Sequence, residues 1–533
     1  MTETRVPVLI VGAGSVGLFA AVFLARHGVA AMAVEQASGP SVHPRATGIG
    51  PRTMELLRQA GLADAVDALA VDMSAGSLGK ISGPTLAAVD LAALPDAPPT
   101  RTGWGSPRIS PALIRGICAQ DRLDTVLAPA AAELGATLRY STRVASVEQD
   151  DSGVTARLDD GTTVRSEYLI AADGARSGIR DALGIGTTGP GALGNPNMSI
   201  LFRADLGRYT GGRHFTTCDI TGPVRGMFVT VDGAKDWIFH TDYQPEQGES
   251  REGFTEEHCR TLVRAAVGDP LLDVEIRSRL PWRVRGLLAD EFQAGRVFLV
   301  GDAAHAVPPQ GAFGLNTGAA DAHNLAWKLA AVLRGQAGPG LLRTYSTERR
   351  AVAAGTLTQA LLRVEHPRLH WDTSPGGAAA RAAVGMASAP VVQLGYRYDS
   401  TAVLDAAPRL PDTEDVALVL DGTPGSRLPH LWIDAQRSTL DLVDTDFALL
   451  TGVDGIAWAQ AAEQVAASLG IAVAATAIEA PEWPSLAGID ATGAVLVRPD
   501  QVIAWRSPGT VASPAECLAA VLCRILDRSS GTR

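Results

Sequence analysis

Three glycines near the start of the chain have the spacing of a phosphate-binding turn. Gly12, Gly14 and Gly17 follow the apolar run Val6–Val11, and a segment with helical apolar spacing, Leu18–His27, comes after them. In a strand–turn–helix unit the first glycine permits the tight turn and the second lets the backbone approach a pyrophosphate. The third lets the helix and strand pack closely. Free N–H groups at the start of the helix then favour a bound phosphate.

An acidic residue completes this pattern. Glu35 lies eighteen residues after Gly17, at the end of a predicted second strand over 30–35, where its carboxylate can accept hydrogen bonds from ribose hydroxyls. The pattern predicts a site for an ADP-containing dinucleotide and does not separate NAD from FAD. The segment 189–194 has the same glycine spacing, but no apolar strand precedes it, and Pro190 and the nearby Asn195-Pro196 favour a loop. We therefore expect a linker there.

Two further blocks place polar groups after buried strands. The apolar run 168–172 is followed by Asp173-Gly174, and the run 296–300 is followed by Gly301-Asp302. Open α/β sheets bind ligands at the carboxyl ends of their strands, and Asp302 can accept hydrogen bonds from a polyol such as a ribityl chain. Leu315-Asn316 then opens a predicted helix, whose amides favour negative charge by about 0.3–2 kcal/mol. A reduced flavin carries such charge along its N1–C2 carbonyl edge.

Length, charge and cysteine content narrow the class of protein. The 533 residues suggest three or four structural units, and the net charge of 46 − 57 = −11 without a basic stripe argues against nucleic acid or membrane partners. Val6–Ala25 is uncharged but is interrupted by Pro7 and three glycines, so we expect no membrane span. Five scattered cysteines without a Cys-x-x-Cys pair indicate a cytoplasmic protein with no disulfide framework and no thiolate metal site.

Together, the three blocks resemble the FAD-dependent aromatic hydroxylases, the class A flavoprotein monooxygenases with the p-hydroxybenzoate hydroxylase fold. The likeness extends to Pro44-Arg45-Ala46, to Gln120-Asp121-Arg122-Leu123 and to the segment 321–329. Tail motifs, including Val497-Arg498-Pro499-Asp500, are similar to the thioredoxin-like C-terminal domain of the subgroup that acts on polycyclic aromatic polyketides, such as anthracycline and angucycline hydroxylases.

The resemblance implies a mixed α/β and α+β fold with three domains. A discontinuous Rossmann-like FAD-binding domain is expected over 1–75, 105–180 and 286–395, and an inserted β-sheet substrate domain over 76–104 and 181–285. A thioredoxin-like domain is expected over 400–533. Because this tail lacks a Cys-x-x-Cys pair, we expect it to serve packing or oligomerisation rather than dithiol chemistry.

The resemblance also implies which residues contact FAD. The glycine turn and Glu35 would hold the ADP half, Arg45 would reach the cofactor beside the mobile flavin, and Gln120 and Asp302 would lie near the ribityl chain. Asp173-Gly174 matches a motif linked to both FAD and NAD(P)H, and Pro308, Leu315 and Asn316 would line the isoalloxazine. The full predicted set is Gly12, Gly14, Ser15, Val16, Gly17, Glu35, Gln36, Arg45, Gln120, Val144, Asp173, Gly174, Asp302, Pro308, Gly314, Leu315 and Asn316.

Short alternating strands rich in aromatic residues are predicted over 196–245, which suggests a sheet that covers a ligand. Aromatic side chains in such strands form the sheet core more often than a substrate wall. We nevertheless take six residues as candidate substrate contacts: Phe202, Phe215, Phe228, Trp237, Phe239 and Pro309. His305 and His323 are expected to make structural hydrogen bonds rather than bind a metal or act as bases.

The implied activity is monooxygenation. With FAD, with NADPH or NADH as a transient co-substrate and with O₂, the protein would hydroxylate a polycyclic aromatic substrate through a flavin C4a-hydroperoxide, as a monomer or homodimer. The flavin supplies the chemistry, so no catalytic acid or base is assigned. Alternatives are a Baeyer–Villiger or ring-opening oxygenase on the same scaffold, a flavin reductase or halogenase, and a non-catalytic nucleotide-binding protein. The Trp-x-Trp-x-Ile-Pro motif of tryptophan-type halogenases is absent.

Overall fold

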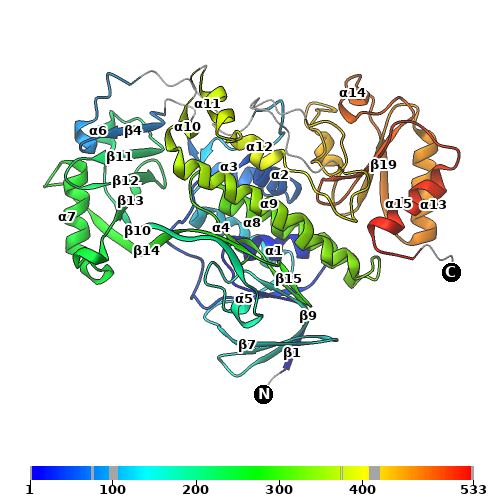
Figure 1. The fold of residues 1–533 in the computed structure, drawn as a ribbon, viewed down its shortest axis with the longest axis horizontal. Coiled ribbons are helices and arrows are strands. Elements are labelled where there is room, and N and C mark those ends of the chain that lie inside the picture. Colours follow the sequence, from blue (N-terminus) through cyan, green and yellow to red (C-terminus); the bar gives the residue numbers. More distant parts are fainter. Residues whose placement is uncertain are drawn as a thin grey trace.

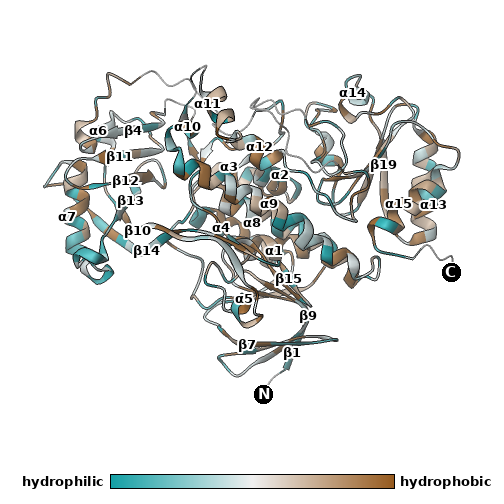
Figure 2. Ribbon diagram, viewed as in Figure 1, coloured by the Kyte–Doolittle hydropathy of each residue, from teal (hydrophilic) through white to brown (hydrophobic). Residues whose placement is uncertain are grey.

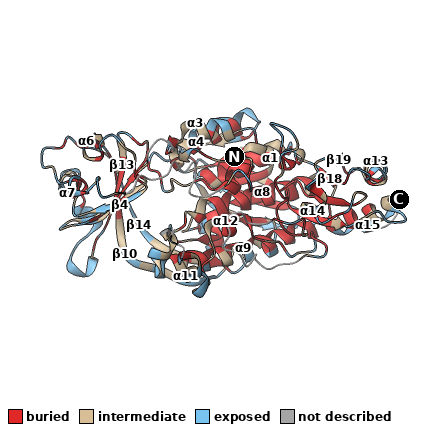
Figure 3. Cartoon of the chain, turned by 90° about the horizontal axis from the view of Figure 1, so that it is seen from above, coloured by how far each residue is buried: buried red, intermediate tan, exposed pale blue. Residues whose placement is uncertain are grey.

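The computed structural model describes residues 3–73, 77–94, 106–372, 374, 376–406 and 420–529. Figure 1 shows a central α/β region, a β-rich region on one side of it and the C-terminal region on the other. Apolar residues concentrate in the strands and central helices (Figure 2), and the helices at the centre are almost entirely buried (Figure 3). Among the described residues, no helix is both long enough and apolar enough to cross a membrane.

The central region is an eight-stranded sheet covered by helices. Its strand order is β15-β16-β9-β1-β2-β6, with β7 and β8 attached through β9, and β16, β9, β1, β2 and β6 run parallel. The strands are β1 (Glu3–Val11), β2 (Ala31–Val34), β6 (Thr137–Arg139), β7 (Val144–Asp150), β8 (Gly153–Leu158), β9 (Thr163–Ala171), β15 (Gln293–Ala294) and β16 (Val297–Leu299). Because β1, β9 and β16 are parallel neighbours, the three blocks that follow them meet at one sheet edge.

Four long helices pack together in this central region: α1 (Ser15–Arg26), α4 (Gln120–Glu133), α8 (Phe313–Leu333) and α9 (Gly340–Glu365). Helix α1 contacts both α4 and α8, and α8 contacts α9. Shorter elements complete the region: α2 (Pro51–Gln59), α3 (Ala63–Leu69), β3 (Val71–Asp72), β5 (Gly116–Ile117), α5 (Gly178–Ala182), α10 (Pro367–Trp371), α11 (Gly377–Ala383) and α12 (Ala389–Leu394).

A second, seven-stranded sheet has the order β17-β14-β10-β13-β12-β11-β4. Its two longest strands, β10 and β14, pair with each other as an antiparallel ribbon. The strands are β4 (Lys80–Gly83), β10 (Thr187–Arg203), β11 (Thr217–Thr221), β12 (Arg225–Thr230), β13 (Asp236–Asp242), β14 (Glu275–Ala289) and β17 (His305–Ala306). One face packs against helix α7 (Glu256–Val267), and the short helix α6 (Gly207–Thr210) lies nearby.

The C-terminal region contains a four-stranded sheet of order β19-β18-β20-β21. β18 (Phe447–Thr451) pairs in parallel with β19 (Val473–Ala477), whereas β20 (Ala494–Val497) and β21 (Ile503–Ser507) pair antiparallel. Helices α13 (Ile456–Leu469) and α15 (Pro514–Ile525) cover one face, and α14 (Trp483–Ala487) covers the other. This order is that of the thioredoxin-like unit expected from the tail motifs.

Two sequence-based assignments are wrong, and both errors come from long-range pairing. The glycine-rich segment 189–194 is not a linker, because it lies inside β10 and pairs with β14 across two register shifts. The sequence also predicts a helix over 111–135, but the helix begins only at Gln120, because Gly116–Ile117 pairs with β3 instead. The sequence further predicts a strand over 416–420, of which residues 416–419 lie outside the described residues.

Candidate cofactor-binding site

The glycine turn contacts the ends of two strands and leaves one side open. Gly12 has a φ of +100°, and a Cβ atom there would overlap the carbonyl oxygen of Ala172, directly after β9. A Cβ atom on Gly17 would overlap the Gly12 carbonyl oxygen. At Gly14, by contrast, no atom of the described residues lies within 4 Å of the Cβ position apart from those of its chain neighbours and its own helix. The backbone of Gly14 therefore faces open space at the start of α1, as a pyrophosphate-binding turn requires.

Close packing of α1 on α8 brings Gly301-Asp302 and the start of α8 to the same sheet edge as the glycine turn. A Cβ atom on Gly301 would lie 3.0 Å from Val16 Cγ2, and one on Gly318 would lie 2.6 Å from the same atom. The absence of side chains at these two positions lets the turn after β16 and the first half of α8 approach the glycine turn. The predicted FAD residues Ser15 and Val16 thus lie buried and half-buried beneath the site.

Glu35 fixes the shape of the turn. Its Oε2 accepts a hydrogen bond from the Ala13 N–H at 2.9 Å, and its Oε1 accepts one from the Ala37 N–H at 2.9 Å. The carboxylate follows β2 and lies beside the glycine turn, where remaining lone pairs can face a ribose. Gln36 is exposed next to it, and Val144 is half-buried at the start of β7.

Asp173 and Asp302 follow neighbouring strands but differ in their surroundings. Asp173 Oδ2 accepts a hydrogen bond from the Ile179 N–H at 3.2 Å, and burial raises the pKa of this carboxyl group. Protein surrounds Asp302 closely enough to raise its pKa by desolvation, which His305 and Arg45 partly oppose. The Asp302 side chain nevertheless remains exposed. Its carboxylate is therefore open to solvent, and Arg45 lies close enough to act on its charge.

The side chain of Asn316 holds the start of α8 in place. Its Oδ1 accepts hydrogen bonds from the Gly50 N–H at 2.8 Å and from Thr53 Oγ1 at 2.7 Å, and its Nδ2 donates to Ala312 O at 2.7 Å and to Gly48 O at 3.1 Å. Because both polar atoms of the buried Asn316 side chain are bonded within the protein, the backbone N–H of Asn316 is the group left for a ligand.

The first turn of α8 offers backbone donors to a ligand. The first N–H groups of a helix have no partner within the helix, and no side chain caps this end. Gly314 and Leu315 are half-buried there, Pro308 is buried nearby, and Pro309 is exposed. Gln120, at the start of α4, donates its backbone N–H to Ala46 O at 2.9 Å, which places it beside the Arg45 segment.

The five aromatic residues chosen as substrate contacts are placed elsewhere. Each is at most 3% exposed and belongs to the core between the second sheet and α7, where the Phe215 and Trp237 rings stack with centroids 5.0 Å apart. This packing contradicts a substrate role, because the strand residues among them lie on the sheet face that packs against α7, and Phe215, just before β11, belongs to the same core. The substrate assignment is therefore wrong for Phe202, Phe215, Phe228, Trp237 and Phe239, which are core residues.

A buried carboxyl group beneath the turn was missed by the sequence analysis. Ser15 Oγ donates a hydrogen bond to Asp124 Oδ1, and both side chains are buried. Burial, with a smaller contribution from Asp121, raises the pKa of Asp124 to about 7, although the hydrogen bond from Ser15 partly opposes the rise. An acidic residue among the apolar positions of the helix over 120–133 was the available signal, because buried carboxyl groups need a partner.

The two histidines singled out in the sequence make side-chain contacts. His305 Nε2 lies 2.7 Å from Asp321 Oδ2, and Arg349 Nε donates to Asp321 Oδ1 at 2.7 Å. His323 Nε2 lies 2.7 Å from Gln59 Oε1. These contacts join α8 to α9 and to α2. The described residues contain no group of three or more His, Cys, Asp or Glu side chains that could hold a metal ion.

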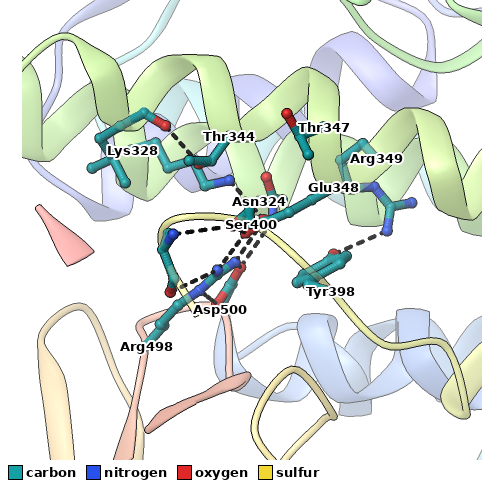
Figure 4. A network of polar contacts seen from close by, with 12 residues as sticks. Asn324, Lys328, Thr344, Thr347, Glu348, Arg349, Tyr398, Ser400, Arg498 and Asp500 are labelled. Carbon is teal, nitrogen blue, oxygen red and sulfur yellow. Dashed lines mark hydrogen bonds and ion pairs between the residues drawn. The ribbon is translucent and has the colours of Figure 1, made fainter. Parts of the chain in front are cut away.

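A buried ionic network joins α8 and α9 to the C-terminal region, as Figure 4 shows. Glu348 on α9 accepts hydrogen bonds from Arg498 NH1 at 2.6 Å, from Lys328 Nζ at 2.7 Å and from Asn324 Nδ2 at 2.8 Å. Arg498 also pairs with Asp500 at 2.5 Å, and all these side chains are buried.

The same network reaches the start of α8 through α2. Arg52 NH2 donates to the Asp500 carbonyl oxygen at 2.8 Å, and Arg52 NH1 pairs with Glu55 Oε2 at 2.8 Å. Thr53, the next residue, makes the hydrogen bond to Asn316 described above. The C-terminal region therefore contacts the elements that position the helix end at the cofactor site.

One sheet edge brings together a Rossmann-type glycine turn, the Glu35 carboxylate after the second strand, the exposed Asp302 carboxylate and the uncapped N-terminus of α8. This combination defines a flavin-nucleotide-binding protein. The FAD binding domain family matches residues 5–360, and the aromatic-ring hydroxylase C-terminal family matches residues 421–529. The chain therefore belongs to the FAD-dependent aromatic-ring hydroxylases, and it is an FAD-dependent monooxygenase.

Relatives cover nearly the whole chain. Tetracenomycin A2 monooxygenase-dioxygenase of Streptomyces glaucescens is 40% identical over 579 residues, covering 100% of this chain and 99% of the relative. Aklavinone 12-hydroxylase of Streptomyces purpurascens is 37% identical over 567 residues, covering 99% and 100%. The crystal structure of aklavinone-11 hydroxylase in a ternary complex with FAD and aklavinone matches with a TM-score of 0.84 and 36% identity, covering 99% of this chain and 100% of that one.

Proposed function

We propose that this enzyme uses FAD, NADPH or NADH, and O₂ to hydroxylate a polycyclic aromatic, polyketide-type substrate. The observation that carries the proposal is the meeting of all three sequence blocks at one sheet edge, with open space at Gly14 and an exposed Asp302 carboxylate. The relatives named for tetracenomycin A2 and aklavinone support the substrate class.

The residues fit FAD in an extended position. The backbone of the glycine turn and Glu35 would hold the ADP half, Asp302, Gln120 and Arg45 would lie along the ribityl chain, and the amides of Leu315 and Asn316 would face the isoalloxazine. When bound, FAD supplies the redox chemistry that activates O₂ after reduction by the nicotinamide nucleotide. The protein's part is to bind both partners, orient the ring system and limit access of water.

The comparisons favour hydroxylation over the alternatives. The two aklavinone relatives are hydroxylases, which favours hydroxylation over a Baeyer–Villiger or ring-opening reaction, and all three named relatives are enzymes, which argues against a non-catalytic nucleotide-binding protein. We further propose the three-domain division given above and a cytoplasmic monomer or homodimer. The five free cysteines support a reducing compartment.

Anaerobic reduction of the FAD-bound enzyme by NADPH and by NADH, with and without a panel of polycyclic phenols, tests the proposal. We expect one class of phenol to accelerate flavin reduction and, in air, to gain one oxygen atom derived from labelled O₂, detected by mass spectrometry. Reduction that is equally fast without a phenol, with hydrogen peroxide as the only oxygen product, would instead identify a simple oxidase.

A further inference from the structure

A groove lies at the β15 edge of the central sheet, away from the glycine turn. Its volume is about 790 Å³, which falls within the range of small-molecule sites. The first turns of α9 form one wall, and the segment from Asp290 to Arg296, which includes β15, forms the other. Arg296 lies four residues before Val300, about 13 Å along the strand. The groove, named here the α9 groove, therefore borders the opposite end of β16 from the cofactor site.

Three arginines line the α9 groove from both walls. Arg343 and Arg350 share one face of α9 with Thr347, because helix positions four and seven residues apart lie on the same side. Arg296 belongs to the other wall, and its guanidinium carbon lies 5.3 Å from the centroid of the Tyr168 ring. Arg343 is exposed, and Arg296 and Arg350 are half-buried. The three guanidinium groups therefore remain accessible to a ligand in the groove.

Backbone carbonyl groups hold two of these guanidinium groups in place. Arg296 donates its Nε to Asp151 O at 3.1 Å and its NH1 to Glu167 O at 3.3 Å. Arg350 donates its Nε to Ala289 O at 3.0 Å. A carbonyl oxygen orients a guanidinium group without neutralising its charge. The positive charge along the groove is thus preorganised.

No carboxylate neutralises this charge in the part of the chain that the structure describes. None of the three arginines there forms an ion pair, although Asp290 and Glu291 line the same groove. The neighbouring Arg349 shows the usual arrangement, because it pairs with Asp321 at 2.7 Å on the buried side of α9. The chain has a net charge of −11, so three arginines without acidic partners in one groove indicate a site for an anion.

The contacts also order the groove along α9. Ser346 Oγ donates to Glu291 Oε2 at 3.2 Å, and Arg350 binds the carbonyl group of the residue before Asp290. The two carboxylates therefore lie toward Arg350, whereas Arg343 lies one to two helical turns, about 5–10 Å, further toward the start of α9. One end of the groove is thus cationic, and the other end carries the acids.

The chemistry of the α9 groove favours an organic phosphate that also carries hydroxyl groups. A phosphate monoester has a charge of about −1.5 to −2 near pH 7, and its oxygens match the forked donors of arginine. The volume of about 790 Å³ exceeds that of a bare ion. Asp290 and Glu291 would repel a second anionic group, but carboxylates accept hydrogen bonds from sugar hydroxyls. A ligand with one phosphate and neighbouring hydroxyls matches both ends.

We propose that the α9 groove binds a ribose phosphate, either free or as part of a nucleotide. The phosphate contacts Arg296 and Arg343, and the ribose hydroxyls donate to the carboxylates of Asp290 and Glu291. This site is separate from the FAD site, because the two lie at opposite ends of β16. It is also independent of the reaction proposed above, so the proposed function stands whether or not the groove binds a phosphate.

Calorimetric titration of the FAD-bound enzyme with ribose 5-phosphate and with ribose, at constant ionic strength, tests the site. Ribose is the same sugar without the phosphate, and the bound FAD keeps the probes out of the glycine turn. We expect ribose 5-phosphate to bind at least about 10-fold more tightly than ribose. Arg343→Gln removes an exposed charge and keeps a polar side chain. It should raise the Kd of ribose 5-phosphate about 10- to 100-fold, the equivalent of one hydrogen bond to a charged group.

Two further variants and one further probe complete the test. Arg277→Gln, at an exposed position on β14 outside the groove, is the matched control and should bind ribose 5-phosphate like the unaltered enzyme. Arg296→Gln tests the opposite wall and should also weaken binding. Ribose 5-phosphate that binds no more tightly than ribose, or an unchanged Kd in both Arg343→Gln and Arg296→Gln, would overturn the site. AMP adds a base to the same ribose phosphate. Tighter binding of AMP would identify a nucleotide as the ligand, and equal or weaker binding would identify a sugar phosphate.

Discussion

Replacing Arg498 with Met tests whether the C-terminal region holds the cofactor site together. Arg498 contacts Glu348 at 2.6 and 2.9 Å and Asp500 at 2.5 Å, and all three side chains are buried. Removing one member of a buried ion pair leaves an uncompensated charge and costs about 3–5 kcal/mol. Because Lys328 still contacts Glu348 at 2.7 Å, we expect the lower end of that range, about 3 kcal/mol.

Urea unfolding of the FAD-bound enzyme measures this effect with two probes, tryptophan fluorescence and the fluorescence of released FAD. We expect Arg498→Met to move both transitions to lower urea, because Arg52 links Asp500 to the elements that hold α8. Arg437→Met removes an exposed pair with Asp434 and should leave both transitions in place. A shift in the tryptophan transition alone, or no shift, would refute the coupling between the C-terminal region and the cofactor site.

The pH dependence of the same variant gives a second test. Burial would raise the pKa of Glu348, but Arg498 and Lys328 hold it below its ordinary value. Its stabilisation is therefore fully present above about pH 4 and is lost as pH falls further. The difference between the unaltered enzyme and Arg498→Met should shrink in acid. A difference that stays constant down to about pH 3 would show that Glu348 does not carry the effect.

Gly14→Val should fold normally and lose FAD, because its side chain would occupy the open space at the turn, and a fully yellow variant would contradict this. Gly17→Ala should lower the thermal midpoint of the FAD-free chain, since its Cβ would overlap the Gly12 carbonyl, and an unchanged midpoint would argue against that packing. Asp302→Ala should weaken FAD binding in a fluorescence titration without lowering the midpoint, and equal affinity would remove Asp302 from the site. Asp124 has its pKa raised to about 7, so its stabilisation is present in acid and is lost as pH rises. Asp124→Asn should reduce the fall of the midpoint between about pH 5 and 8, and an equal fall would show that another group is responsible.

The positions in the fold of the predicted cofactor residues could be inferred from the sequence better than those of the predicted substrate residues. The glycine turn, Glu35, Asp173 and Asp302 are readable because each follows a short buried strand, and parallel neighbouring strands bring their ends together. The role of the Asn316 side chain could not be predicted from the sequence. Three of its four partners lie on the segment over 48–53, more than 260 residues away along the chain.

The faces of the second sheet could not be assigned from alternation alone. A period of two separates Phe202 and Phe239 from Ser199 and His240, but only the packing of α7 shows which set forms the core. The β10–β14 pairing was missed for a related reason, because Gly191 pairs with Gly286, 95 residues further along, and this pairing overrides the local loop preference of the glycines.

A crystal structure of the chain purified with its bound cofactor tests the central claim most directly. We predict one FAD per chain, with its pyrophosphate at Gly14, its ribityl chain beside Asp302 and its isoalloxazine facing the amides of Leu315 and Asn316. A folded chain that retains no FAD, or an FAD bound away from this sheet edge, would contradict the assignment.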